Sequence, residues 1–173
     1  MVLELLKRWF GGGKELVSYD ELRPGKAVLR GTVKAGEEQV RSPLKGLSCV
    51  AYYYRAWYKA QARGKWVERV VKDAEVYAPS FVLALEGGEV RVQPPRSAPF
   101  DPQEHRQLLA RGFAGFQATE QVIRPGTKVK LTGNVHRDGE QWVLRLRRID
   151  LIPEEEQAAG PYKRPERRRR RKR

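Results

Sequence analysis

The sequence predicts a mainly β protein built around a small, antiparallel, barrel-like sheet with one or two short helices. Three observations support this fold class. Segments of alternating apolar and polar residues recur along the chain, tight-turn signals separate them in pairs, and glycine stands inside two of them. Hydrophobic residues make up 40% of the 173 residues, which suits one domain with a modest core.

The first ten residues predict a short amphipathic helix, which three glycines at positions 11–13 end. A helix of this length is too short to be stable alone in water. We therefore expect residues 1–13 to dock on the domain itself, on a partner or on a membrane surface. The apolar stripe of this helix consists of Val2, Leu3, Leu5, Leu6, Trp9 and Phe10.

Seven strands are expected between residues 26 and 148. The clearest is Leu47–Ala60, whose dense aromatic residues suit a long strand, and the turn Ala62–Gly64 joins it to its hairpin partner. Gly87-Gly88 and Asp138-Gly139 mark two further hairpins. The seven predicted strands are Lys26–Lys34, Leu47–Ala60, Lys65–Asp73, Phe81–Leu85, Glu89–Gln93, Lys128–Val135 and Gln141–Arg148.

A helix is expected over about residues 102–111. Asp101 can cap it, Pro102 suits its first position, and Glu104 stands where a capping box places its acidic residue. Leu108 and Leu109 are expected to face the sheet.

An internal similarity favours a barrel. The segment Arg23–Val33 resembles Arg124–Val135, which has one residue inserted. In both, a Pro-Gly turn leads into a strand that contains a glycine, and such glycines often mark a bulge or a barrel bend. We expect the two strands to hold similar places in a small barrel that resembles an oligonucleotide-binding (OB) fold.

The predicted long strand has one face that suits nucleic acid. Tyr53, Arg55, Trp57 and Lys59 alternate along it, so that aromatic and basic side chains interleave. An OB barrel can use such a face to stack bases and neutralise phosphates. The same pattern also arises when aromatic side chains pack across strands under long basic ones. The sequence leaves both interpretations open.

The chain ends in a basic tail. The formal net charge is +14, and residues 161–173 carry +8 of it through nine basic residues and one acidic residue. Residues 153–173 are poor in apolar side chains and dense in charge, which predicts disorder. Terminal runs of like charge often serve as interaction arms.

The run Ser42–Arg55, SPLKGLSCVAYYYR, resembles the GIDE domain, which occurs in mitochondrial and plastid membrane E3 ubiquitin ligases and in many prokaryotic membrane proteins. Further motifs of that family follow over roughly residues 18–152 in matching order and spacing. They are the strand with Trp66, the apolar hairpin from Phe81 to Val92, and the residues Glu120, Pro125, Gly126 and Gly133.

The chain departs from the ligases in two ways. A RING finger binds zinc through sets of four Cys and His ligands, and one cysteine with two histidines cannot supply them. No apolar run approaches the ~20 residues that a membrane-spanning helix needs. The membrane role that the resemblance implies is therefore expected to rest on the N-terminal helix and the tail.

No catalytic apparatus is expected. Cys49 cannot form an intrachain disulfide, and its apolar strand neighbours predict a buried structural thiol. His105 and His136 are expected at the surface, with no further ligands for a metal. The sequence thus predicts a protein that is not an enzyme and uses no cofactor or metal.

Two functions stay open. The first is a GIDE-like protein-interaction module in the cytoplasm, binding an unknown protein partner while held at the anionic inner membrane face. Its predicted membrane- or anion-binding residues are Trp9, Phe10, Arg167, Arg168, Arg169, Arg170, Arg171, Lys172 and Arg173. The alternative is an OB-like nucleic-acid-binding protein that uses the tail and the residues Tyr53, Arg55, Trp57 and Lys59.

Overall fold

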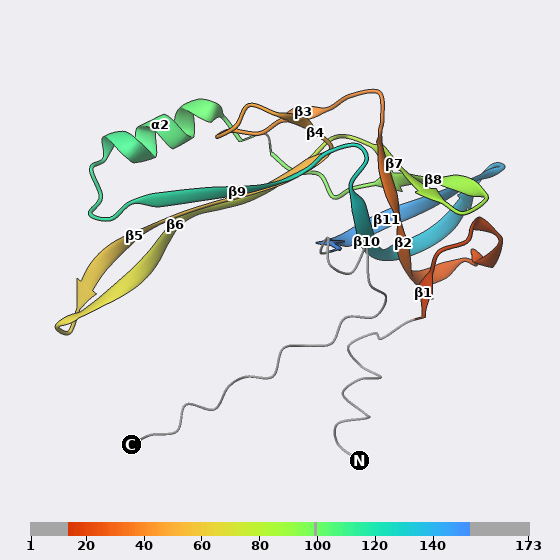
Figure 1. Cartoon of the computed structure of the whole chain (residues 1–173), viewed down its shortest axis with the longest axis horizontal. Coiled ribbons are helices and arrows are strands. Elements are labelled where there is room, and N and C mark those ends of the chain that lie inside the picture. The colour runs from red at the N-terminus through yellow and green to blue at the C-terminus, as the bar shows by residue number, and fades with distance from the viewer. Residues whose placement is uncertain (1–13, 99, 153–173) are drawn as a thin grey trace, which may run out of the picture.

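The computed structural model describes residues 14–98 and 100–152, and the chain is mainly β, as expected (Figure 1). The predicted N-terminal helix, with Trp9 and Phe10, and the predicted tail lie outside the described residues. The elements are β1 (Glu15–Leu16), the 3-10 helix η1 (Tyr19–Glu21), β2 (Gly25–Ala35), β3 (Val40–Arg41), β4 (Ser48–Cys49), β5 (Ala51–Ala62), β6 (Lys65–Tyr77), β7 (Phe81–Leu85), β8 (Gly88–Gln93), α2 (Pro102–Ala110), β9 (Gln117–Ile123), β10 (Lys128–Asp138) and β11 (Gln141–Leu151).

Five strands close into a ring. Their order is β2, β10, β11, β8 and β7, and β7 pairs with β2 again. Only β8 and β11 run parallel, and the other pairs in the ring are antiparallel. If β2, β7, β8, β10 and β11 are numbered 1 to 5 in chain order, the ring read from β2 through β7 has the order 1-2-3-5-4 and returns to 1. This is OB-like connectivity, and it confirms the predicted barrel.

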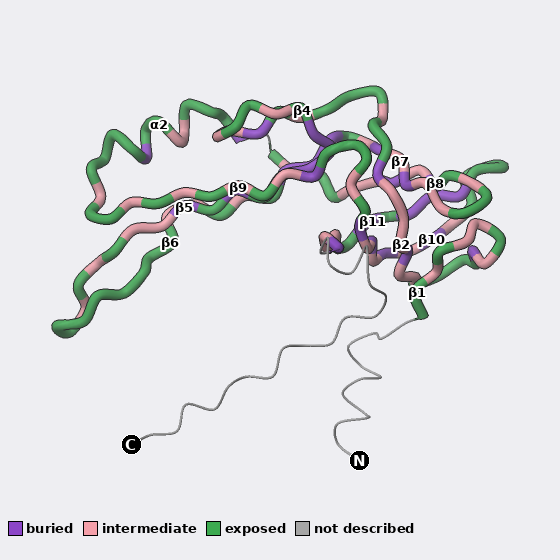
Figure 2. The backbone as a smooth tube through the Cα atoms, viewed as in Figure 1, coloured by how far each residue is buried: buried purple, intermediate pink, exposed green. Residues whose placement is uncertain are grey.

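The barrel is filled by alternate residues of its strands, which appear as buried segments in Figure 2. The short β1 adds a parallel pairing beside β2. The inward-facing residues with no solvent exposure are Leu29, Val33, Phe81, Leu83, Val90, Val92, Val129, Leu131 and Leu144.

The two strands of the internal similarity, β2 and β10, lie side by side in the barrel. Gly133 follows a register shift between β10 and β11, so the predicted bulge is present. A Cβ at Gly133 would lie 2.2 Å from the Arg145 carbonyl oxygen, and one at Gly31 would lie 2.3 Å from the Ala84 carbonyl oxygen. Both glycines let neighbouring strands approach where no side chain fits.

A three-stranded sheet, β6-β5-β9, projects from the barrel, and we call it, together with α2, the arm (Figure 1). The twelve residues of β5 give it a length of about 40 Å. At its root, Ala51, Tyr77 and Ile123 belong to the barrel core. The arm therefore shares buried residues with the barrel at its base and extends beyond it toward the β5–β6 turn.

One face of the arm is covered by α2, and Tyr52, Tyr54 and Ala56 are buried beneath it with Leu108 and Phe100. The Asp101 side chain accepts a hydrogen bond from the Gln103 N–H at 2.8 Å, which confirms the predicted cap.

Two details of the helix prediction are corrected. Leu108 is buried, but Leu109 is 53% exposed, because the next residue along a helix points about 100° away. Glu104 does not close a capping box; its carboxylate pairs with Lys72 on β6 at 2.9 Å.

All seven predicted strands are present, and most of them are longer than predicted. The predicted strand Leu47–Ala60 is divided at Val50, where the chain passes from β4 into β5. Val50 donates its N–H to the Ile123 carbonyl, while the Val50 carbonyl accepts from Ala78, both within 2.9 Å. The strands β1, β3 and β9 were not expected, and β1 and β3 have only two residues each.

Candidate interaction surfaces

The predicted nucleic-acid face lies on the side of β5 that points away from α2. Tyr53, Arg55 and Lys59 are exposed and Trp57 is half-buried, so the structure does bring the four residues into one row. The Trp57 indole N–H is buried, and no group in the described part of the chain accepts from it.

Acidic side chains oppose this row across the β5–β6 pair. Glu75 stands opposite Tyr53, Asp73 opposite Arg55, and Glu68 opposite Lys59. A hydrogen bond to Asp73 raises the pKa of the Tyr53 hydroxyl. Since three carboxylates face two basic side chains, the row and its cross-strand partners carry a formal charge of −1, which disfavours phosphate.

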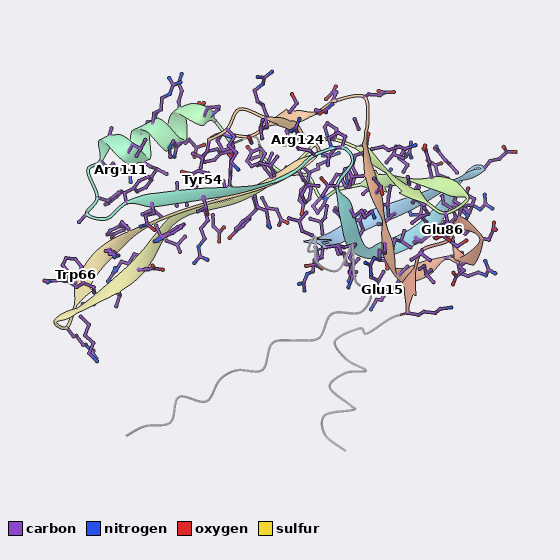
Figure 3. All side chains as sticks on the ribbon, in the orientation of Figure 1. Glu15, Tyr54, Trp66, Glu86, Arg111 and Arg124 are labelled. Carbon is purple, nitrogen blue, oxygen red and sulfur yellow. The ribbon has the colours of Figure 1, made fainter. Side chains whose placement is uncertain are left out.

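The far end of the arm, the β5–β6 hairpin tip, exposes apolar side chains. Trp66 is 63% exposed, Val70 45% and Val67 39%, and Figure 3 shows Trp66 near the turn that joins the two strands. Four basic residues and one acidic residue surround them, which gives the tip a charge of +3. These residues are Lys59, Arg63, Lys65, Arg69 and Glu68.

The outer edge of β6 is also open. Along Lys65–Val76, β5 is the one strand that pairs with β6 within the described ranges 14–98 and 100–152. A strand with one free edge presents unpaired N–H and C=O groups and can accept a further strand. The sequence pattern does not indicate the exposed patch at the tip, because its apolar and charged residues are interspersed on both faces of β6.

A second surface lies on the barrel, where the described chain begins and ends. Glu15 at the start contacts Lys130 on β10, with Oε1 2.7 Å from Nζ. At the end, the Ile152 N–H donates to the Lys128 carbonyl at 3.4 Å. The two ends of the described chain are therefore tied to Lys130 and Lys128, two positions apart on β10.

This side of the barrel is basic. Glu15 and Asp150 are ion-paired there, Glu15 with Arg30 and Lys130 and Asp150 with Arg148. Basic residues on β2, β10 and β11 outnumber these two carboxylates, and they are Lys26, Arg30, Lys128, Lys130, Arg145, Arg147 and Arg148. These basic residues are dispersed along the sequence, and the strand pairing brings them to one side of the barrel.

Some of the residues behind the GIDE resemblance, Ser42 and Glu120 among them, meet in a clasp at the root of the arm. The Glu120 carboxylate accepts from the Ser42 hydroxyl at 3.0 Å, the Leu44 N–H at 2.7 Å and the Lys45 N–H at 2.9 Å. Ser42 is 2% exposed and also accepts from the Leu47 N–H. These motif residues hold the β3–β4 turn onto β9, which is a structural role.

The single thiol is inert in the fold. Cys49 has no solvent exposure, as expected, and burial raises the pKa of its thiol to about 11. A protonated, enclosed thiol is a poor nucleophile.

His105 differs from the expectation of a surface histidine. It is half-buried, with Nδ1 2.8 Å from the Tyr54 hydroxyl, and lies edge-on to the ring of Tyr54. This pair fastens α2 to the covered face of the arm.

Within the described ranges, no three His, Cys, Asp or Glu side chains lie close enough together to hold a metal ion. No helix in the same part of the chain has the length and apolar character to cross a membrane. In comparisons with known proteins, no protein-family model matches the chain and no curated protein matches it.

Proposed function

We propose that this protein is a non-catalytic, GIDE-like interaction module that is held at an anionic membrane surface and engages a protein partner through its arm. One observation carries the proposal: both ends of the described chain are tied to Lys128–Lys130 on the basic side of the barrel. The amphipathic segment 1–13 and the basic tail 153–173 therefore continue the chain from neighbouring positions.

Two weak membrane signals at one place reinforce each other. A short amphipathic segment binds a bilayer weakly and reversibly, and a polybasic segment adds about 1 kcal/mol for each Lys or Arg near an anionic surface. Because Glu15 and Ile152 contact the same strand of the barrel, the segments that continue from them can reach one flat surface together.

The arm supplies the surface for the partner. Exposed tryptophan is enriched among the residues that dominate protein interfaces, and the tip presents Trp66 with Val67 and Val70. The charge of +3 around them favours a partner with an apolar pocket rimmed by carboxylates.

Co-sedimentation with vesicles tests the membrane part. The intact protein is expected to bind vesicles of phosphatidylcholine mixed with phosphatidylglycerol, and to ignore pure phosphatidylcholine. Trp9→Glu, and separately the change of Arg167–Arg173 to glutamine, should each weaken binding. An intact protein that stays in the supernatant with anionic vesicles at low salt would overturn the proposal.

The nucleic-acid alternative makes a different prediction. If the row on β5 stacks bases, Trp57→Ala should weaken single-strand binding by about 1–3 kcal/mol. The carboxylates of Glu75, Asp73 and Glu68 across from that row favour the membrane proposal instead. Oligonucleotide binding that depends on Trp57, in a protein that ignores vesicles, would reverse the choice.

A further inference from the structure

The basic side of the barrel contains a groove. It has a volume of about 430 Å³ and lies where β2 begins, between β1 and the bulged part of β10 and β11. Its floor is apolar, with Leu16, Ala27 and Val28 among its lining residues. This volume falls within the range of small-ligand sites, ~300–1,000 Å³.

Four basic side chains line the rim of this groove: Lys14, Arg23, Lys26 and Arg147. Glu21 is the one acidic residue of the lining, and it pairs with Lys14 at 3.1 Å. Arg23 donates through one Nη to the carbonyls of Asp20 and Leu22, which neutralises none of its charge. The lining therefore keeps a charge of +3.

Two of these cations take part in no ion pair among the described residues. Neither Lys26 nor Arg147 forms an ion pair with any residue in the ranges 14–98 and 100–152. Both are exposed, and they stand on β2 and on β11, one on each flank of β10. An arginine and a lysine placed in this way can grip the oxygens of one phosphate from two sides.

We infer that this groove binds the phosphate headgroup of an anionic phospholipid, with the glycerol part of the lipid on the apolar floor. The inference rests on the proposed membrane function and names the group that the barrel itself would hold. A basic rim over an apolar floor matches an amphiphile whose charged and apolar ends lie next to each other.

The groove suits lipid better than single-stranded nucleic acid. Sequence-tolerant binding of single strands relies on aromatic side chains on which successive bases stack. None of the lining residues of the groove is aromatic. The aromatic row at Tyr53 and Trp57 lies on the arm and is opposed by carboxylates.

The first experiment measures vesicle binding by the full chain carrying Lys26→Gln and Arg147→Gln. Partition onto phosphatidylglycerol-containing vesicles should fall about 30-fold, which corresponds to two basic side chains at about 1 kcal/mol each. The matched control is Lys45→Gln with Arg106→Gln, which removes the same charge from exposed positions over the arm that form no ion pair with the described residues. The control is expected to lose much less binding, and equal losses would overturn the inference.

The second experiment locates the lipid by amide NMR of the full, unmodified chain. A short-chain, soluble phosphatidylglycerol should shift the amide signals of Ala27, Val28, Thr132 and Gly133, which line the groove. Inorganic phosphate alone should shift them less, because it lacks the part that rests on the floor. Equal shifts with phosphate, stronger shifts with an oligonucleotide, or shifts confined to the tail would each overturn the lipid assignment.

The two proposals fail in different ways. If the intact protein ignores anionic vesicles, the membrane function fails, even if the soluble lipid still shifts the groove. If the protein binds vesicles but the Lys26 and Arg147 changes act like their control, only the groove inference is overturned. The unfolding midpoint of each variant, compared with the parent, shows whether a loss of binding comes from a loss of fold.

Discussion

The barrel pairs its strands into a closed ring, whereas the arm leaves the outer edge of β6 and most of one face uncovered. Both regions are built from strands in which apolar and polar residues alternate, but the apolar side chains are buried to different extents. In the barrel, every strand contributes side chains to a core without solvent exposure. Beyond the cover of α2, the β5–β6 hairpin has no core to fill, and Trp66 and Val70 stay exposed. The comparison indicates that stability resides in the barrel and that the arm tip is free for recognition.

Removing a barrel side chain is the strongest way to test this division. Leu131→Ala should lower the free energy of unfolding by about 3 kcal/mol, because Leu131 is fully buried and leaves a cavity. Leu109→Ala on the arm, where the side chain is 53% exposed, should change it by less than about 0.5 kcal/mol. Urea denaturation measures both, and equal losses would refute the division.

A smaller loss is expected from the clasp at the root of the arm. Glu120→Ala leaves the Ser42 hydroxyl and the N–H groups of Leu44 and Lys45 without their acceptor, at a cost of about 2 kcal/mol. Hydrogen exchange should show that the Leu44 and Lys45 amides lose protection while the barrel keeps it. Gln121→Ala, at the exposed next position, serves as the control, and unchanged protection in Glu120→Ala would contradict the role of the clasp.

The buried Cys49 thiol should make the stability of the protein depend on pH at alkaline pH but not at neutral pH. Because the pKa of Cys49 rises from 9.0 to about 11 on folding, the thiol ionises more readily in the unfolded chain. Its contribution to stability is complete below pH 9 and is lost as the pH rises from 9 toward 11. Cys49→Ala should flatten that part of the stability profile, and a thiol reagent at pH 8 should modify Cys49 only in denaturant. Rapid modification of the folded protein would show that the site is accessible.

The smallest effect on stability is expected at the arm tip. Trp66→Ala should change the free energy of unfolding by less than about 0.5 kcal/mol, since this side chain is 63% exposed. Trp142→Ala is the matched change in the barrel, where Trp142 is 8% exposed, and should cost about 4 kcal/mol. A large loss of stability in Trp66→Ala would mean that the tip is structural and not a recognition surface.

Local patterns in the sequence predicted the hairpins, the helix cap at Asp101 and the burial of Cys49 correctly. Each of these depends on residues close together in the chain. The strand β9 was missed because Gln117–Ile123 alternates weakly and is ordered by its pairing with β5, some 65 residues earlier.

The candidate surfaces were harder to predict for the same reason. Lys26 and Arg147 are far apart in sequence, and only the order β2-β10-β11 gathers them around one groove. The row from Tyr53 to Lys59 was identified correctly as one face, but the carboxylates opposite it depend on the register of β6. Ser42 and Glu120 were noted as motif residues, while their contact across 78 positions was not foreseen.

The length and register of the β5–β6 pair set how far the arm tip lies from the barrel and which face each side chain occupies. Adding two residues to each strand would move the tip outward by roughly 7 Å and keep every side chain on its face. Adding one residue to each would turn Trp66 to the opposite face at nearly the same reach. Because the barrel strands lie outside this hairpin, the reach of the arm can change without changing the barrel that supports it.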